Sequence, residues 1–316
     1  MNQATNMSTS SQTKVDSKSA DGTRPFRFIF VGGSARSGTT LVQKMLCAHS
    51  CVCGGPEFDH AVPAMKLFAR MSSPQQLERQ KFYYSEEEVS DRFREFYASL
   101  FDGLASRNPG LKYVSEKTPA NIAAAADLLR LFPDAFYVNV MRDGRDVVLS
   151  HQKVLNRFKQ QHGKKGKKWW FEYSVRDVSR KWNSDIERYY EMMASDSISP
   201  RIMNVKYEEI VSHPEKVLKP ILEKLGLDFE PQLSKPESVD KEQLGYNVNV
   251  DGVWYTDGMF DQSLNSLSVS GWQKNLSWPK RMLVNFMQCR NLQRVGYPVP
   301  PSVLRLRHIV DYLRGR

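Results

Sequence analysis

The fold is decided by the stretch Phe28-Ile29-Phe30-Val31-Gly32-Gly33-Ser34-Ala35-Arg36-Ser37-Gly38-Thr39-Thr40-Leu41. Its apolar first part is typical of a buried strand, and its glycine-rich second part is typical of a loop that wraps a phosphate before a helix begins. Gly33 and Gly38 have the spacing of such a loop, but Thr39 stands where nucleoside triphosphate enzymes carry lysine. The stretch therefore predicts a phosphate site with a chemistry other than that of an ATPase.

The composition is that of a globular protein of 316 residues with a formal net charge of +10 at pH 7. A content of 41% hydrophobic residues is enough for one core, and the positive charge favours anionic ligands. Residues 1–23 carry almost no large apolar side chains, which predicts a disordered tail followed by a single domain over residues 24–316. Because no window resembles a membrane span or a secretory signal, the expected location is cytoplasmic, away from membranes.

The four cysteines do not have the pattern of a disulfide framework, since Cys47, Cys51 and Cys53 are crowded together and Cys289 is distant. A zinc site is an open alternative, but no second pair of Cys or His has suitable spacing. The interpretation is that the thiols are buried and that the protein holds no metal.

Short β-rich apolar runs at residues 26–31, 135–141 and 202–205 predict buried parallel strands. Helical periodicity or end signals predict helices over residues 37–48, 89–104, 119–131, 143–156, 171–193, 214–225 and 279–294, with Thr118 as an N-cap. This alternation predicts an α/β fold with a central parallel sheet flanked by helices, whose ligands bind at the carboxyl ends of the strands. The polar residues 229–271 are expected to form long loops across that edge.

The loop after the first predicted strand has the donors for one 5′-phosphate. Backbone N–H groups of residues 33–40 and the start of the following helix can bind a phosphate, and further donors come from the side chains of Arg36, Ser37, Thr39 and Thr40. Thr39 cannot supply the charge with which a lysine neutralises β and γ phosphates. The loop therefore suits a 5′-phosphate whose leaving group needs less stabilisation by positive charge than a polyphosphate does.

A second anion-binding pattern follows another predicted strand, in Arg142-Asp143-Gly144-Arg145. Arg142 at the strand end and Ser150 two helical turns later can reach one phosphate together, although a salt-bridged turn is the plainer alternative. Two anion sites at two strand ends favour a nucleotide with two separated phosphates. The basic run Lys164-Lys165-Gly166-Lys167-Lys168 is either a solvated loop or a lid over an anionic ligand.

With these motifs the chain resembles, from about Phe28 to Tyr297, the sulfotransferases that use 3′-phosphoadenosine 5′-phosphosulfate (PAPS), and most of all the tyrosylprotein sulfotransferase branch. The resemblance implies a P-loop-like sulfotransferase fold, PAPS as co-substrate, 3′-phosphoadenosine 5′-phosphate (PAP) as product, and no metal. It assigns nucleotide binding to Gly33, Arg36, Ser37, Gly38, Thr39, Thr40, Arg142, Ser150 and Tyr207.

The same resemblance assigns the catalytic roles. Glu57 stands at the family's catalytic base, Lys117 at its catalytic lysine, and Ser270 at a serine that contacts the sulfonate, where Arg36 also contributes. A carboxylate that takes the acceptor's proton, with cationic and hydroxyl donors on the leaving side, fits sulfonate transfer. From the residues alone, a glutamate such as Glu57 is most often a surface carboxylate, and Lys117 is most simply a lysine at a helix start that faces water.

Departures from the branch shape the expected acceptor. Asp59 and Pro63 stand where the branch holds acidic peptides with arginines, and Gly54 and Ser115 replace its cysteines. The first hypothesis is therefore sulfonate transfer to a hydroxyl, or to an amine, of a small metabolite that can be cationic, as in secondary metabolism. The alternatives are a protein-tyrosine or carbohydrate sulfotransferase, a P-loop small-molecule kinase, and a non-catalytic nucleotide binder. No nucleic-acid module is visible.

Overall fold

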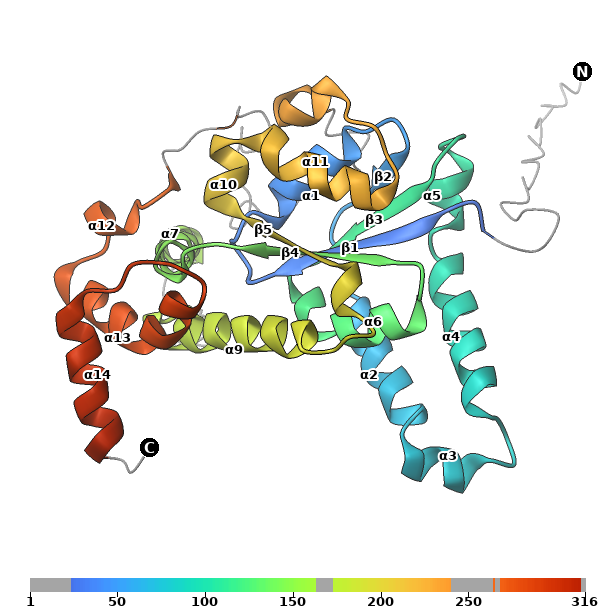
Figure 1. Ribbon diagram of the computed structural model, residues 1–316, viewed down its shortest axis with the longest axis horizontal. Helices are drawn as coiled ribbons and strands as arrows, with labels where there is room; N and C mark the ends of the chain where they lie inside the picture. The colour runs from blue at the N-terminus through green and yellow to red at the C-terminus, as the bar shows by residue number, and fades with distance from the viewer. Residues whose placement is uncertain (1–23, 163–172, 240–263, 265–267, 314–316) are drawn as a thin grey trace, which may run out of the picture.

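The computed structural model describes residues 24–162, 173–239, 264 and 268–313, and its centre is a five-stranded sheet in the order β2-β3-β1-β4-β5 (Figure 1). Every neighbouring pair of strands is parallel. The strands are β1 (Arg27–Gly33), β2 (Val52–Gly54), β3 (Tyr113–Lys117), β4 (Phe136–Met141) and β5 (Ile202–Lys206). Because all strands run the same way, their carboxyl ends meet at one edge, as the α/β prediction requires.

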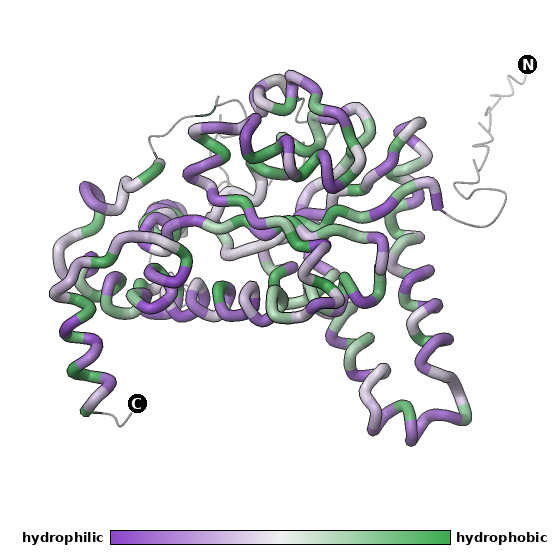
Figure 2. The backbone as a smooth tube through the Cα atoms, viewed as in Figure 1, coloured by the Kyte–Doolittle hydropathy of each residue, from purple (hydrophilic) through white to green (hydrophobic). Residues whose placement is uncertain are grey.

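β1 alternates its side chains between two cores. Phe28 and Phe30 pack into one cluster, while Ile29 and Val31 pack into another on the opposite face of the sheet. This alternation is the two-residue period of a strand. Since helices cover both faces of the sheet, β1 is apolar along most of its length. Figure 2 shows hydrophobic colours along much of the central strands.

Helices form a layer on each face of the sheet (Figure 1). One face is covered by α1 (Thr39–Cys47), α10 (Tyr207–Ser212) and α11 (Pro214–Leu225). The other face is covered by α2 (Ala61–Met71), α4 (Glu86–Ser99), α6 (Ala125–Leu131) and α9 (Val175–Met193). Short helices α3 (Pro74–Gln80) and α5 (Asp102–Ser106) precede and follow α4, and 3-10 turns cover Pro119–Ala123, Ser199–Arg201, Pro231–Ser234 and Pro236–Ser238.

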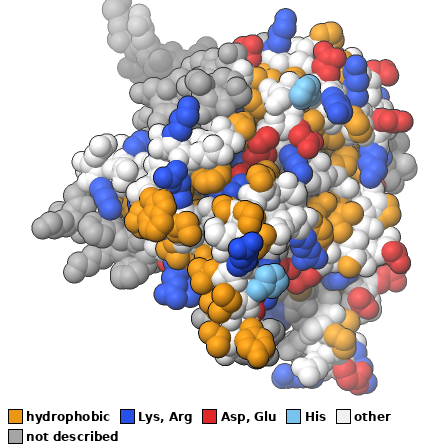
Figure 3. Space-filling model, turned by 60° about the vertical axis from the view of Figure 1, so that its left-hand side comes forward, with side chains coloured by type: hydrophobic (Ala, Val, Ile, Leu, Met, Phe, Trp, Pro, Cys, Tyr) orange, Lys and Arg blue, Asp and Glu red, His pale blue; other side chains and the backbone are white. Residues whose placement is uncertain are grey.

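The remaining helices form one end of the molecule, and all of them except the last share a third apolar cluster with α9. They are α7 (Gly144–His162), α12 (Trp272–Asn275), α13 (Trp278–Arg294) and α14 (Pro301–Leu313). Figure 3 turns this end forward and shows apolar side chains gathered on its surface among lysines and arginines. The exposed apolar side chains of α14 include Leu306, Ile309 and Leu313.

Two predicted helices differ from the structure. The helix predicted over residues 89–104 is divided into α4 and α5, because Phe101 turns inward and its ring lies 5.2 Å from that of Phe28. The helix predicted from Pro119 begins as a 3-10 turn, and the Thr118 hydroxyl donates to Glu116 and does not cap it. Strands β2 and β3 and helices α2, α3, α10 and α14 were not predicted.

Several predictions fall on residues that the structure does not describe. The disordered tail over residues 1–23, the Lys164–Lys168 run and most of the predicted loops over residues 229–271 lie outside the described ranges. Within those ranges, no helix combines the length and the apolar character needed to cross a bilayer.

Candidate active site

The loop between β1 and α1 is folded by residues with positive φ. Gly33, Arg36 and Gly38 have φ of 142°, 72° and 97°. Gly33 lies against β4, where a Cβ on it would come within 2.3 Å of the carbonyl oxygen of Val140. Thr39 is the first residue of α1, so the loop ends at a helix N-terminus, where backbone N–H groups face outward to bind an anion.

Replacing Gly33 with alanine is expected to destabilise the fold by about 2 to 3 kcal/mol, because the methyl group meets backbone in a conformation that alanine rarely adopts. The measurement is thermal unfolding. Gly110→Ala is the matched control, since Gly110 also has positive φ, 85°, but a Cβ there has no atom within 4 Å. Equal losses in the two variants would contradict the role of the close approach to β4.

Arginine and serine side chains from the loop, from the residue after β4 and from α7 meet at the ends of β1 and β4. Arg142 donates from Nη1 to the carbonyl oxygen of Arg36 at 3.1 Å, and Arg36 donates from Nε to the Ser150 hydroxyl at 3.2 Å. The structure thus brings these three predicted nucleotide-binding residues together. The plainer alternative, a salt-bridged turn, describes Arg145, which is buried and pairs with Asp143 at 2.6 Å.

Two buried donors in this cluster fit an anionic ligand. Among the described residues, neither Ser37 Oγ nor Arg142 Nε has a hydrogen-bond partner, although both atoms are buried. A buried donor without a partner is costly, and such groups usually have a ligand or water as partner. Their position beside the loop fits phosphate oxygens as the missing acceptors.

Tyr207 lies in the same cluster. The Arg142 guanidinium stacks 4.2 Å above the centre of its ring, and the Tyr207 hydroxyl is 2.6 Å from Ser268 Oγ. Arg142 also donates from Nη2 to the carbonyl oxygen of Ser268 at 2.6 Å. The segment that leads to Ser270 is therefore held directly by the nucleotide-side residues.

Glu57 and Lys117 form an ion pair at the carboxyl ends of β2 and β3. Lys117 Nζ lies 2.7 Å from Glu57 Oε1 and 3.3 Å from Thr40 Oγ1, so the pair touches the phosphate-binding loop. The lysine side chain is fully buried, while 29% of the Glu57 side chain is exposed. Burial lowers the pKa of Lys117, and the charge of Glu57 opposes that effect. Lys117 therefore does not face solvent, and Glu57 is a partly exposed carboxylate that pairs with it.

Ser270 is exposed and has a positive φ of 56°. Its N–H donates to Asp146 Oδ2 at 2.8 Å, and the N–H of Trp272 donates to Asp146 Oδ1 at the same distance. The hydrogen bond described for Ser270 is thus made to α7, and the role of Ser270 at the sulfonate stays a prediction.

The sequence did not single out two buried carboxylates beside the site. Asp146 holds the Ser270 segment, and Glu116 accepts hydrogen bonds from Thr118 and Asn121. Burial raises the pKa of both, to about 7 for Glu116. Glu116 stands beside Lys117 and Asp146 follows Arg145, so acidic residues inside the two motifs were the available signal.

The predicted thiols are only partly buried. Cys289 is buried, whereas Cys47, Cys51 and Cys53 are half-buried, and all four are free. Across the described ranges, no three His, Cys, Asp or Glu side chains are grouped to hold a metal ion.

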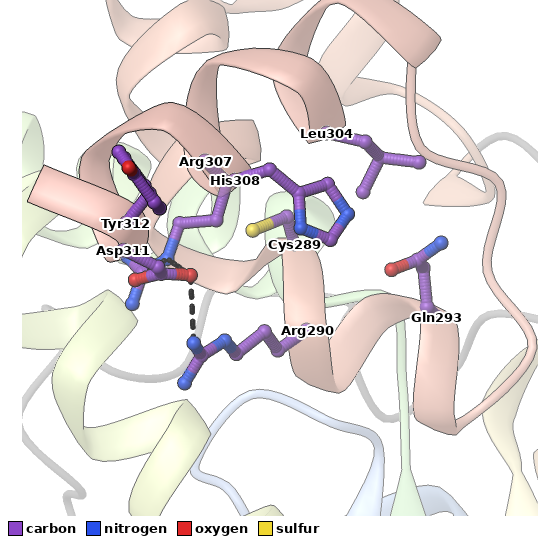
Figure 4. A pocket seen from close by; sticks show the side chains of 8 residues that line it. All are labelled: Cys289, Arg290, Gln293, Leu304, Arg307, His308, Asp311 and Tyr312. Carbon is purple, nitrogen blue, oxygen red and sulfur yellow. Dashed lines mark hydrogen bonds and ion pairs between the residues drawn. The ribbon is translucent and has the colours of Figure 1, made fainter. Parts of the chain in front are cut away.

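A pocket of about 460 Å³ lies between α13 and α14, away from these residues (Figure 4). Figure 4 shows Arg290 reaching across it to Asp311, and the two side chains pair at 2.6 Å. Arg307 also pairs with Asp311, at 3.1 Å, so a single carboxylate serves two arginines in the pocket wall. None of the predicted site residues lines it.

Comparisons with known proteins point to one family. The sequence model of the sulfotransferase family matches residues 28–231. Protein-tyrosine sulfotransferase 2 of Gallus gallus is 30% identical over 226 residues, which are 68% of this chain and 57% of that protein. Protein-tyrosine sulfotransferase 1 of Danio rerio is 31% identical over 208 residues, 64% of this chain and 53% of that protein. The chain thus spans about half the length of the curated relatives it matches.

Solved structures confirm the predicted fold. The sulfotransferase domain from the curacin biosynthetic pathway has a TM-score of 0.58 at 18% identity, over 87% of this chain and 99% of that domain. Mouse sulfotransferase SULT7A1 complexed with PAP has a TM-score of 0.50 at 13% identity, over 86% of each chain.

Proposed function

Because residues 28–231 match its sequence model, this chain belongs to the sulfotransferase family, and we propose that it transfers the sulfonate group of PAPS to an acceptor hydroxyl. The observation that carries the proposal is the Glu57–Lys117 pair, 2.7 Å apart and in contact with Thr40 of the phosphate-binding loop. A base, a cation and a phosphate-binding loop are thereby joined in one place.

The donor's two phosphates have separate binding groups. The loop from Gly33 to Thr40 would hold the 5′ side through its backbone N–H groups and through Ser37. Arg142 and Ser150 would hold the 3′-phosphate, with Tyr207 stacked beneath the arginine. The unpartnered Ser37 Oγ and Arg142 Nε support this assignment, because each would gain a charge-assisted hydrogen bond.

The transfer needs one proton and one bond exchange. The acceptor hydroxyl gives its proton to the Glu57 carboxylate while its oxygen forms the new bond to sulfur. The bond between sulfur and the bridging oxygen breaks, and its electron pair stays on the 5′-phosphate of PAP. Lys117 and Thr40 donate to the side on which this negative charge develops. The products are PAP and the sulfated acceptor, and no redox partner is needed.

The named relatives favour the phenolic hydroxyl of a protein tyrosine as acceptor. This reverses the order of the sequence-based hypotheses, in which a small metabolite came first. The small-molecule acceptor remains the second candidate because Asp59, two residues after Glu57, is exposed and acidic. An acidic group there favours an acceptor with a cationic group and disfavours an acidic peptide.

The acceptor is tested by incubating the protein with PAPS and matched acceptors, then measuring sulfated products by mass spectrometry. The acceptors are tyrosine peptides with acidic, neutral or basic flanks, and small phenols with and without an amine. We expect donor-dependent sulfation of tyrosine peptides, with basic flanks preferred over acidic ones. Sulfation of the phenols and of no peptide would support the second candidate.

A parallel incubation with ATP and Mg²⁺ tests the kinase alternative, which Thr39 disfavours. If no acceptor is sulfated and the protein does not bind PAP, the proposed function is refuted.

A further inference from the structure

Glu116 is a buried carboxylate that the proposed reaction does not use. It lies at the end of β3 next to Lys117, and 3% of the residue is exposed. Its Oε1 accepts from the Thr118 hydroxyl at 2.7 Å, and its Oε2 accepts from Asn121 Nδ2 at 2.5 Å. Each carboxylate oxygen thus has a donor close in the chain.

The Thr118 hydroxyl also makes a hydrogen bond to the loop that carries Glu57. It accepts the backbone N–H of Asp59 at 3.2 Å. A hydroxyl has one proton, and because Glu116 takes that proton in a hydrogen bond, a lone pair of the oxygen remains for Asp59. The direction of the Thr118 hydroxyl is therefore set by Glu116.

Asp59 needs such a contact because its backbone is in the left-handed region, with φ of 59°. A residue other than glycine adopts this conformation at a cost in energy, so surrounding contacts must hold it. Asp59 is two residues after Glu57, and the turn there sets the direction in which the chain leaves the catalytic carboxylate.

Burial of Glu116 is itself unfavourable. Desolvation raises its pKa, while the hydrogen bonds from Thr118 and Asn121 oppose that rise. Lys117 and Asp59 are the charged groups that act on it. A neutral side chain would fill the same space without the cost of burying a charge, so a role for this carboxylate is to be sought in the contacts it makes.

We propose that Glu116 is a positioning residue: through the Thr118 hydroxyl it fixes the turn at Asp59 and so holds the Glu57 carboxylate against Lys117. The inference rests on the proposed function, since it takes Glu57 as the base. It concerns residues that do not themselves touch the reacting atoms.

The test is the pair Thr118→Val and Thr118→Ser in the full chain, assayed with PAPS and the best acceptor found. Valine has the shape of threonine without the hydroxyl, and we expect kcat to fall about ten- to a hundredfold, the range for a misplaced catalytic group. The KM for PAPS is expected to stay within about twofold, because the loop and Arg142 are untouched. Serine keeps the hydroxyl and should restore most of kcat.

Tyr113→Phe is the matched control for the loss of a buried hydrogen bond. Tyr113 lies at the opposite end of β3, where its hydroxyl donates to the carbonyl oxygen of Leu225 at 2.6 Å. This variant should lower the melting temperature and leave kcat unchanged. In a double-mutant cycle, Glu116→Met and Thr118→Val should be strongly non-additive in kcat, because either change alone removes the hydrogen bond between the two side chains.

The outcomes separate the two proposals. A wild-type protein that neither binds PAP nor transfers sulfonate refutes the proposed function. A wild-type protein that turns over refutes the positioning role alone in any of three cases: Thr118→Val keeps full kcat, Thr118→Ser is as slow as Thr118→Val, or Tyr113→Phe is equally slow.

Discussion

The variant Glu57→Gln is expected to lower the kcat of sulfonate transfer at least about a hundredfold, the lower range for removing a general base. Glutamine keeps an oxygen that can accept from Lys117 Nζ, which lies 2.7 Å from Glu57 Oε1 in the structure, but it cannot take the acceptor's proton. PAP affinity should not change, because the nucleotide-side residues are left intact. Turnover and calorimetric PAP binding are the two measurements.

Glu209→Gln controls for the loss of one negative charge. Glu209 is an exposed residue of α10, so its variant should keep wild-type turnover. Thermal unfolding of Glu57→Gln should be measured as well, since the buried Lys117 then loses the charge of its paired carboxylate. Unchanged turnover in a folded Glu57→Gln protein would show that another group is the base.

Arg142→Ala is expected to weaken PAP binding by about 2 kcal/mol, or roughly thirtyfold, which is the worth of a charge-assisted hydrogen bond. Binding of adenosine 5′-monophosphate, which lacks the 3′-phosphate, should change less than about threefold. The two nucleotides should differ because the buried Arg142 Nε atom, which has no described partner, can donate to an oxygen of the 3′-phosphate. Calorimetric titration of each variant with both nucleotides gives the comparison.

Arg180→Ala serves as the control for net charge. Arg180 pairs with Asp177 on the surface of α9, and 60% of its side chain is exposed. Its loss should affect both nucleotides slightly and equally. If Arg142→Ala weakened the two nucleotides to the same extent, the 3′-phosphate would have to be bound elsewhere.

Local sequence patterns were sufficient for much of the fold and of the nucleotide side. The apolar run of β1, the glycine loop after it and the helix Pro214–Leu225 were predicted because period and end signals lie within a few residues of one another. Arg142 and Ser150 were predicted to share one site and Arg36 to lie in another, and the structure joins all three because the carboxyl ends of parallel strands meet.

β3 could not be predicted in the same way. Ser115, Glu116 and Lys117 are polar and yet buried in its last three positions. Their burial depends on partners that local hydropathy does not report, such as Glu57, 60 residues before Lys117. The hydrogen bond from the Ser270 N–H to Asp146, 124 residues away, could not be predicted for the same reason.

The ion pair between Glu57 and Lys117 also governs how charge is balanced while the proposed reaction proceeds. Before transfer, the partly exposed carboxylate compensates an ammonium group that is itself fully buried. When Glu57 takes the acceptor's proton it becomes neutral, and Lys117 loses the negative charge of the carboxylate that pairs with it. The bridging oxygen of the donor becomes negative in the same step, so the ammonium exchanges one counter-ion for another. The sum of charges around Lys117 stays constant, and a buried lysine can serve both states without any movement of charge through the protein.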